Sequence, residues 1–305
     1  MDHKELLAGL SQQQLGELLA KNNRLALIRF GIQVAISGLL AAGILLGVPF
    51  WPLLMLPLGL LLIFQFTLLH ETVHSTPFDA LWLNRWVGRL CGFIIMVPPL
   101  WFQYFHLAHH RHTQDPEKDP ELEGGKPDTL PQYIWHVSGI PLWVSLAKVL
   151  LVNAFGKIDY AYVPDRAKKR VRLEARLTLL TYLSIAALSA ITGSPHLIWI
   201  WVVPLLIGQP FLRLYLLAEH GRCPMVANML MNTRTTYTNR FVRWLAWNMP
   251  YHAEHHALPK VPFHKLPALN ELTREHLTSV SNGYVEFHTQ TLENIRSESA
   301  KASSG

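Results

Sequence analysis

The sequence predicts an all-α integral membrane protein with four transmembrane helices in two hairpins, interfacial helices and a histidine-rich cytoplasmic cap. Three observations lead to this prediction. Half of the 305 residues are hydrophobic and only 16% are charged, which is well below the proportion in soluble proteins. Two stretches are long enough and apolar enough to cross a bilayer twice. The sixteen histidines concentrate in clusters with helical spacing.

The first hairpin is expected at 28–48 and 51–70. No Asp, Glu, Lys, Arg or His occurs from Phe30 to Leu69, and the stretch is interrupted by Pro49 and Pro52. A bilayer crossing needs about 20 apolar residues, so the stretch predicts two spans joined by a tight turn. The apolar core of a signal peptide is shorter, which indicates that this hairpin stays in the membrane.

The second hairpin is expected at 175–193 and 197–218. An apolar stretch runs from Leu177 to Leu212 and carries a turn at Gly193–His196. Buried helices of a soluble protein are the alternative for both hairpins. Uncharged runs of this length are rare in globular cores, so the membrane interpretation is favoured.

Charges at the ends of the spans predict the orientation. Basic residues precede both hairpins, whereas the two turns carry no Lys or Arg. These residues are Lys21, Arg24, Arg29, Arg166, Lys168, Lys169, Arg170, Arg172 and Arg176. Because positive charge is retained in the cytoplasm, both hairpin bases and both chain termini are expected on the cytoplasmic side.

The remaining segments are expected to complete one domain, 1–293, with a cap formed by 70–136 and 219–276. Stretches 80–105 and 139–155 mix tryptophan with basic residues and predict interfacial helices, although either could be half of a third hairpin. The acidic, proline- and glycine-rich segment Gln114–Pro131 predicts a surface connection. A disordered tail is expected at 294–305.

Eight histidines fall into three short motifs. His-x-x-x-His begins at His70, and His-x-x-His-His begins at His106 and again at His252. Residues at i, i+3 and i+4 share one face of a helix, so each motif can direct its nitrogens the same way. The candidate metal ligands in these motifs are His70, His74, His106, His109, His110, His252, His255 and His256.

A ninth candidate ligand, His220, follows the second hairpin, so all nine are expected on the cytoplasmic side. Nine neutral nitrogens suit two six-coordinate redox metals with a position left for oxygen. His112 either orients one of the metal ligands or has no role at the metal, and the sequence favours neither alternative. Five further histidines are expected to be ordinary hydrogen-bonded residues, namely His136, His196, His264, His276 and His288.

Other functions are disfavoured. The motif His70-Glu71-x-x-His74 also matches zinc metallopeptidases, in which the glutamate is the general base, but a catalytic zinc takes three protein ligands and would leave six histidines unused.

Cys91 and Cys223 form neither a disulfide framework nor a Cys-x-x-Cys site. The net charge of +6 is not arranged in a stripe that would bind nucleic acid. A scaffold that binds metal without catalysis would not need open coordination beside lipid.

The three histidine motifs, in this order and with these spacings, resemble those of the membrane fatty acid desaturase and hydroxylase superfamily. The resemblance covers roughly residues 61–269, and Asn248–Pro259 resembles bacterial members. It implies a di-iron centre on the cytoplasmic face of a four-span fold, here in a bacterial inner membrane, with His220 as the ninth ligand. No fused cytochrome b5 signature, His-Pro-Gly-Gly, occurs in the chain. Electrons are therefore expected from a separate ferredoxin, cytochrome b5 or reductase.

Five polar residues are candidates for supporting roles around this centre. Glu71, Glu219 and Glu254 adjoin proposed ligands and are expected to accept hydrogen bonds from imidazole N–H groups. Asn248 could hold a metal-bound water or serve a turn. Arg213, in an apolar helix two turns before His220, could pair with a substrate head group or reach to the interface.

The expected activity is oxygen-dependent oxidation of a lipid acyl chain, with desaturation favoured. Hydroxylation or ketolation of a lipid or carotenoid, and oxidative decarboxylation of a fatty acid, stay open as alternatives on the same scaffold. Two iron ions would be the cofactor and O2 the co-substrate, because no side chain can oxidise an unactivated C–H bond.

Overall fold

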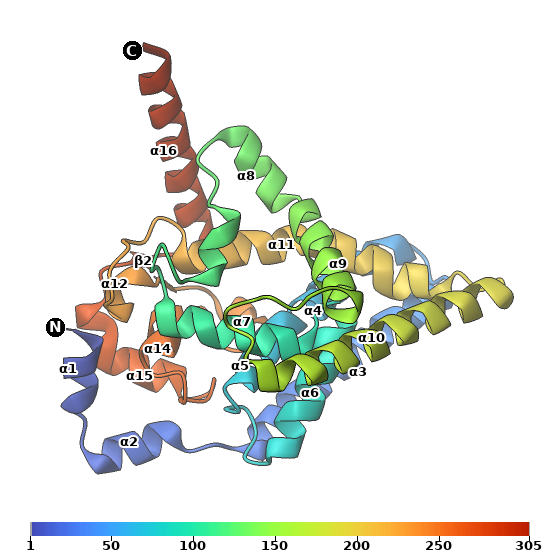
Figure 1. Cartoon of the computed structure of the whole chain (residues 1–305), viewed down its shortest axis with the longest axis horizontal. Coiled ribbons are helices and arrows are strands. Elements are labelled where there is room, and N and C mark those ends of the chain that lie inside the picture. The colour runs from blue at the N-terminus through green and yellow to red at the C-terminus, as the bar shows by residue number, and fades with distance from the viewer. Residues whose placement is uncertain (1, 305) are drawn as a thin grey trace.

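A computed structural model describes residues 2–304 and consists almost entirely of helices (Figure 1). Four helical segments are long and apolar enough to span a membrane. Two of them contain short breaks. The segments are α2 with α3 (Gln12–Leu19 and Asn23–Leu45), η1 with α4 and α5 (Trp51–Leu54, Met55–Ile63 and Gln65–Val73), α10 (Asp165–Ile191), and η3 with α11 (Ile198–Val202 and Val203–His220).

The outward faces of these segments are apolar. Leu39 and Leu46 of the first segment are 74% and 80% exposed, and Ile191 at the end of α10 is 83% exposed. Large apolar side chains exposed in this way would be unfavourable in water, whereas lipid tails would cover them. The number of long apolar helices therefore agrees with the four expected spans.

Two further helix pairs are sharply bent. α6 (Leu81–Ile94) and α7 (Pro99–His112) meet at 103°, and α8 (Leu130–Val137) and α9 (Ile140–Phe155) meet at 56°. α7 begins at a proline, a residue suited to the first turn of a helix. If each bent pair were one span, the chain would have up to six spans. The interfacial location of these helices stays a prediction.

Helices α4 and α11 cross at two glycines. A Cβ added to Gly59 would lie 2.1 Å from the carbonyl oxygen of Pro204, and one added to Gly208 would lie 2.4 Å from that of Gly59. Small residues at such a crossing let two helix backbones approach closely. This contact joins the second and fourth long segments, whose ends carry His70 and His220.

The cap follows α11 and contains the C-terminal histidine motif. Its elements are α12 (Met229–Asn232), β1 (Thr235–Thr236), α13 (Arg240–Leu245), α14 (His252–Ala257), α15 (Leu266–Thr273), η4 (Arg274–His276) and β2 (Val280–Ser281). β1 and β2 pair in parallel, with Thr235 opposite Val280. The buried Gln33 of α3 accepts a 3.0 Å hydrogen bond from the indole of Trp247, which attaches the cap to the first span. The short helix α1 (His3–Ala8) packs beside α12 through Leu6 and Leu230.

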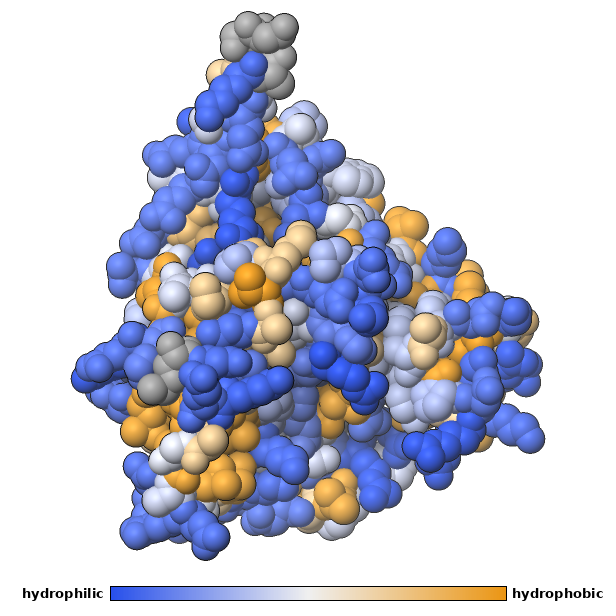
Figure 2. All heavy atoms as spheres, turned by 60° about the vertical axis from the view of Figure 1, so that its left-hand side comes forward, coloured by the Kyte–Doolittle hydropathy of each residue, from blue (hydrophilic) through white to orange (hydrophobic). Residues whose placement is uncertain are grey.

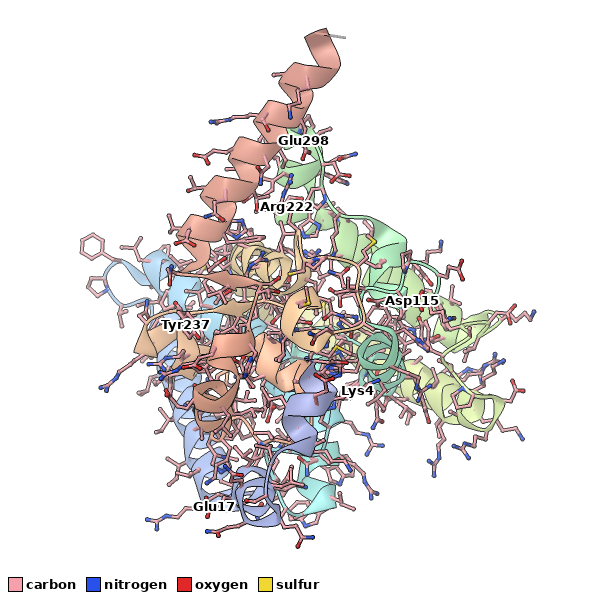
Figure 3. The ribbon with its side chains drawn as sticks, turned by 90° about the vertical axis from the view of Figure 1, so that its left-hand side faces the viewer. Lys4, Glu17, Asp115, Arg222, Tyr237 and Glu298 are labelled. Carbon is pink, nitrogen blue, oxygen red and sulfur yellow. The ribbon has the colours of Figure 1, made fainter. Side chains whose placement is uncertain are left out.

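The C-terminal segment differs from the sequence prediction. The expected disordered tail at 294–305 is instead the continuation of α16 (Tyr284–Ser304) as far as Ser304. Ile295 is only 1% exposed and clusters with Phe287, so the helix has an apolar anchor. Arg222 and Glu298 lie 3.3 Å apart and add an ion pair (Figure 3). The visible face of α16 is almost entirely hydrophilic, as expected for a helix in water (Figure 2).

Candidate metal centre and substrate cavity

All nine predicted histidines converge at one place between the spans and the cap. They come from four elements that are far apart in the sequence. α5 carries His70 and is followed by its C-cap His74, α7 carries His106, His109 and His110, α11 ends with His220, and α14 carries His252, His255 and His256. Helical spacing places the rings of each motif on one side, as the sequence predicts.

Five of these histidines form a first group. One ring nitrogen from each lies within 4.8 Å of the others, in a set made of His70, His74, His106, His110 and His255. The Nε2 atoms of His74 and His106 are 3.0 Å apart. The group joins both histidines of the first motif to two of the second and one of the third. A metal bound here would therefore connect α5, α7 and α14.

The second group contains His109, His220 and His256, whose ligand nitrogens also lie within 4.8 Å of one another. His252 is adjacent, because its Nε2 is 3.2 Å from that of His220. His110 and His256 stack with ring centroids 3.9 Å apart, so the two groups share a boundary. With His252 counted, the second group has four histidines and the first group has five.

The chemistry of these nitrogens fits bound metal ions. Both ring nitrogens of His70, His110 and His255 are buried without any hydrogen-bond partner among the described residues. Burial lowers the pKa of His252, His255 and His256 well below the usual imidazole value, so these rings are neutral at physiological pH. A neutral imidazole with a free nitrogen is a metal ligand, and a buried unpaired polar atom is otherwise costly.

Carboxylates support the outer nitrogens of several ligands. Asp119 Oδ1 lies 2.9 Å from Nδ1 of His109. Glu219 Oε1 lies 3.4 Å from Nδ1 of His252, and Glu71 Oε1 lies 3.9 Å from Nδ1 of His255. The hydrogen bond of Asp119 fixes the tautomer of His109. Glu71 and Glu219 lie beside ligand rings, but Nδ1 of His252 and Nδ1 of His255 form no hydrogen bond among the described residues, so the predicted acceptor roles stay predictions.

The segment Gln114–Pro131 is more than the expected surface connection. Asp119 is 4% exposed and Gln114 is 2% exposed. The short helix η2 (Pro120–Gly124) holds Glu121 with its Oε2 3.2 Å from Nε2 of His109. Sequence reasoning missed both acidic residues because they lie in an irregular segment. The signal available was a run of carboxylates directly after the second histidine motif.

The structure does not show the predicted roles of Glu254 as a partner of an imidazole and of Asn248 as a holder of a metal-bound water. Glu254 accepts hydrogen bonds from Thr235, Asn270 and Thr273 and contacts no imidazole. It lies between ligands on α14 and therefore points to the other side of the helix, where it links the cap elements.

Asn248 has left-handed backbone dihedrals, and its amide donates to the carbonyl oxygen of Phe263 at 2.9 Å. The amide is therefore occupied by the cap backbone, and the turn role that the sequence left open is the one observed.

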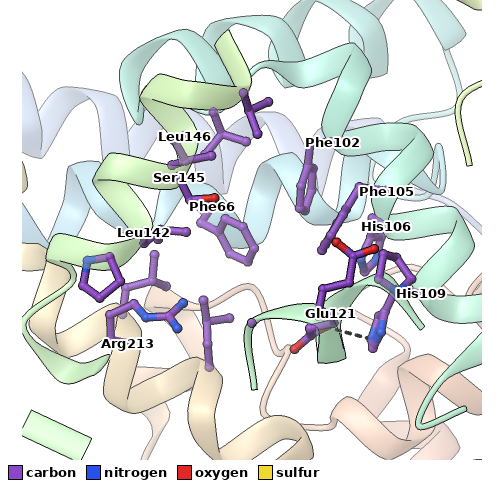
Figure 4. A pocket seen from close by; sticks show the side chains of 18 of the residues that line it. Phe66, Phe102, Phe105, His106, His109, Glu121, Leu142, Ser145, Leu146 and Arg213 are labelled. Atoms are coloured by element: carbon purple, nitrogen blue, oxygen red, sulfur yellow. Dashed lines mark ion pairs between the residues drawn. The ribbon is translucent and has the colours of Figure 1, made fainter. Parts of the chain in front are cut away.

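A cavity of about 550 Å³ opens beside the histidines and extends between α7, α8, α9 and α11. Phe66, Phe102 and Phe105 form part of its wall, and His106 and His109 lie at one end (Figure 4). The guanidinium of Arg213 points into the cavity from the opposite side (Figure 4). Cavities of this size and composition are typical of small-molecule sites.

The other histidines lie outside both groups, as expected. His288 contacts the carbonyl oxygen of Leu214, and His196 contacts Ser194 in the turn before η3. His112, His264 and His276 belong to neither group. His136 differs from the prediction of an ordinary core residue, because it lines the cavity and contacts Arg213.

Comparison with known proteins adds a family match. A family model described as "Fatty acid desaturase" matches residues 32–288, which include all nine histidines. The chain is also similar to dihydrorhizobitoxine desaturase of Bradyrhizobium elkanii, with 28% identity over 68% of this chain and 64% of the relative.

Two further relatives have similar sequence identities to this chain. Sphingolipid delta(4)-desaturase DES1 of Rattus norvegicus is 27% identical over 68% of this chain and 61% of the relative. A fatty acid desaturase of Bacillus subtilis (strain 168) is 25% identical over 71% of this chain and 65% of the relative. The chain thus matches slightly less than two thirds of the length of these curated relatives.

Proposed function

Because the chain belongs to the fatty acid desaturase family, we propose that it is a di-iron membrane oxidoreductase that uses O2 to desaturate a lipid acyl chain. One observation carries this proposal. Nine histidines form two adjacent groups in which several ring nitrogens are buried without a hydrogen-bond partner, and a largely apolar cavity ends at them. A pair of redox metals beside a cavity that accepts an acyl chain is what such a reaction requires.

Iron is the proposed metal, held by the five-histidine group and by the group of His109, His220, His252 and His256. Bound iron would supply the oxidant that removes hydrogen from an unactivated C–H bond. Overall, O2 accepts two hydrogens from the chain, together with two electrons and two protons from outside, and gives a double bond and two waters. A separate ferredoxin, cytochrome b5 or reductase supplies the electrons.

The chain's own residues position the substrate and keep water away from it. Phe66 and Phe102 stack edge to face with ring centroids 5.4 Å apart, and both line the cavity beside His106. An acyl chain packed against these rings would present its carbons to the histidine groups and displace water. Asp119 holds the ring of His109 in a fixed tautomer, and Glu219 lies 3.4 Å from Nδ1 of His252.

The proposed location is a bacterial inner membrane, with both termini and the histidine groups on the cytoplasmic side. The basic residues at the hairpin bases support this orientation. Lipid is the proposed substrate class because the cavity adjoins apolar helices, and because the names of the relatives refer to sphingolipid and fatty acid desaturation.

The test is lipid oxidation by the protein purified in detergent and supplied with a reduced electron carrier. We expect about two irons per chain and O2 consumption in step with loss of two hydrogens from a lipid, measured by mass spectrometry. A product that gains one oxygen or loses carbon dioxide would instead indicate hydroxylation or decarboxylation. One tightly bound zinc and no iron, or unchanged lipid modification without O2, would contradict the proposal.

A further inference from the structure

The end of the cavity opposite the histidines contains a cation without an anionic partner. Arg213 projects into the cavity from α11, and its Nη2 lies 2.8 Å from Nε2 of His136 (Figure 4). Its Nε is buried without a hydrogen-bond partner, and Arg213 forms no ion pair within the described part of the chain. A buried guanidinium contacted only by an imidazole is costly unless an anion joins it.

A second unpaired donor lies one helical turn before Arg213. Gln209 is 1% exposed, lines the same cavity, and has an amide Nε2 without a hydrogen-bond partner. Its position is fixed by Gly139 between α8 and α9, where an added Cβ would lie 2.2 Å from Cγ of Gln209. Two donors on one face of α11 are therefore held in place and left free.

The carboxylates that line the cavity are already engaged elsewhere or exposed. Glu121 lies 3.2 Å from His109, and Glu219 lies 3.4 Å from His252. Glu123 is exposed to solvent. Glu121 is the carboxylate that acts electrostatically on Arg213, but its ion pair is with His109. An anion in direct contact with Arg213 would therefore have to come from a bound molecule.

Together with the proposed function, on which this inference rests, these contacts identify a class of substrate. We infer that Arg213 and Gln209 bind the anionic oxygen group of a lipid, either the carboxylate of a free fatty acid or the phosphate of a phospholipid. Guanidinium donors match the geometry of both groups. His136 packs against the guanidinium and positions it.

The position of Arg213 also limits where the lipid is oxidised. Arg213 precedes His220 by two turns of one helix, which corresponds to about 10 Å at 1.5 Å per residue. The anionic group would thus lie about 10 Å from the histidine groups. The oxidised carbon is therefore expected near the middle or the polar end of an acyl chain rather than at its terminal methyl group.

Equilibrium binding to the purified full-length protein tests this inference. The probes are palmitate, its uncharged methyl ester and dipalmitoyl phosphatidylglycerol, each labelled with tritium. Arg213→Gln and Gln209→Leu are compared with Arg170→Gln, a matched loss of charge at an exposed position of α10. Iron content and the melting temperature of each variant are measured on the same preparations.

We expect the wild type and Arg170→Gln to bind one of the two anionic probes at least tenfold more tightly than the methyl ester. Arg213→Gln should weaken that binding by about 10- to 100-fold, the usual effect of a charge-assisted hydrogen bond, and should leave methyl ester binding and iron content unchanged. Gln209→Leu should have a smaller effect, and Arg213→Lys should restore part of the affinity. Preference for palmitate or for phosphatidylglycerol identifies the carboxylate or the phosphate as the ligand.

The inference is overturned if the methyl ester binds as tightly as both anionic probes, or if Arg213→Gln binds all three like the wild type. Neither result bears on the metal, because binding needs no turnover. A different result separates the two proposals. If the protein contains no iron but still binds an anionic lipid through Arg213, the proposed function is contradicted and the anion site is supported.

Discussion

His109 and Asp119 lie 2.9 Å apart, from Nδ1 to Oδ1, and both side chains are buried. The contact joins the second histidine motif to the acidic segment that follows it. Because Asp119 accepts from Nδ1, the proton is fixed there, and the deprotonated Nε2, which faces His220 and Glu121, can bind a metal. Hydrogen bonds from His109 and from two backbone amides outweigh the effect of burial and keep the pKa of Asp119 below its usual value, so the carboxylate is ionised.

Asp119→Asn should therefore weaken metal binding at the second group. The expected loss of iron affinity or turnover is about 10- to 100-fold, the usual effect of removing a carboxylate that orients a ligand. Iron per chain and turnover are measured against Asp128→Asn, an exposed residue of the same segment. Equal iron content and equal turnover in both variants would show that Asp119 does not orient His109.

His255→Ala should remove metal from the first group, because this ring is the contribution of α14 to that group. Turnover should fall to background and iron content by about half, whereas the amount of protein in the membrane should stay near the wild-type level, since insertion depends on the apolar spans. His196→Ala is the matched control, because His196 is exposed in the turn before η3. If His196→Ala had the same effect as His255→Ala, the division into ligands and bystanders would be wrong.

Much of this arrangement can be predicted from local pattern. The four long apolar helices follow from hydropathy, and eight of the nine candidate ligands follow from spacing, because both are properties of short segments. The division of the rings into two groups could not be predicted, since the second and third motifs each contribute to both groups. The contacts of Asp119 with His109 and of Glu254 with Asn270 bridge separate elements, and only the folded chain brings them together.

Gly59→Ala should destabilise the protein, because the added Cβ would lie 2.1 Å from the carbonyl oxygen of Pro204 and force α4 and α11 apart. Overpacking of this kind typically costs about 1–3 kcal/mol. Thermal unfolding in detergent measures the effect as a lower Tm. Gly38→Ala is the control, because a Cβ there meets nothing within 4 Å. Equal melting temperatures would show that the crossing can relax.

Epitope tags test the proposed orientation. Tags placed before His3 and after Gly305 should both be protected from protease in intact cells, because the basic residues lie at the hairpin bases. A tag inserted after Ser194, in the second turn, should be cleaved from outside. A cleaved terminal tag would contradict an even number of spans with cytoplasmic ends.

Glu71 separates oxygenation from hydrolysis, the two reactions compatible with its motif. Its Oε2 accepts hydrogen bonds from Thr76 at 2.9 Å and from the backbone amide of Phe263 at 3.1 Å, and its Oε1 lies 3.9 Å from Nδ1 of His255. One carboxylate oxygen is thus held by the chain, and the other faces a proposed ligand rather than the cavity. This arrangement suits a residue that positions His255.

Glu71→Gln should therefore lower iron affinity or turnover by about 10- to 100-fold without abolishing either. A peptidase base would behave differently, because the amide could not accept the proton of the attacking water and all activity would be lost. Iron content, O2 consumption and peptide cleavage are measured together, with Glu17→Gln on the exposed α2 as the control. Peptide cleavage by the wild type that disappears in Glu71→Gln, with no need for O2, would decide for hydrolysis.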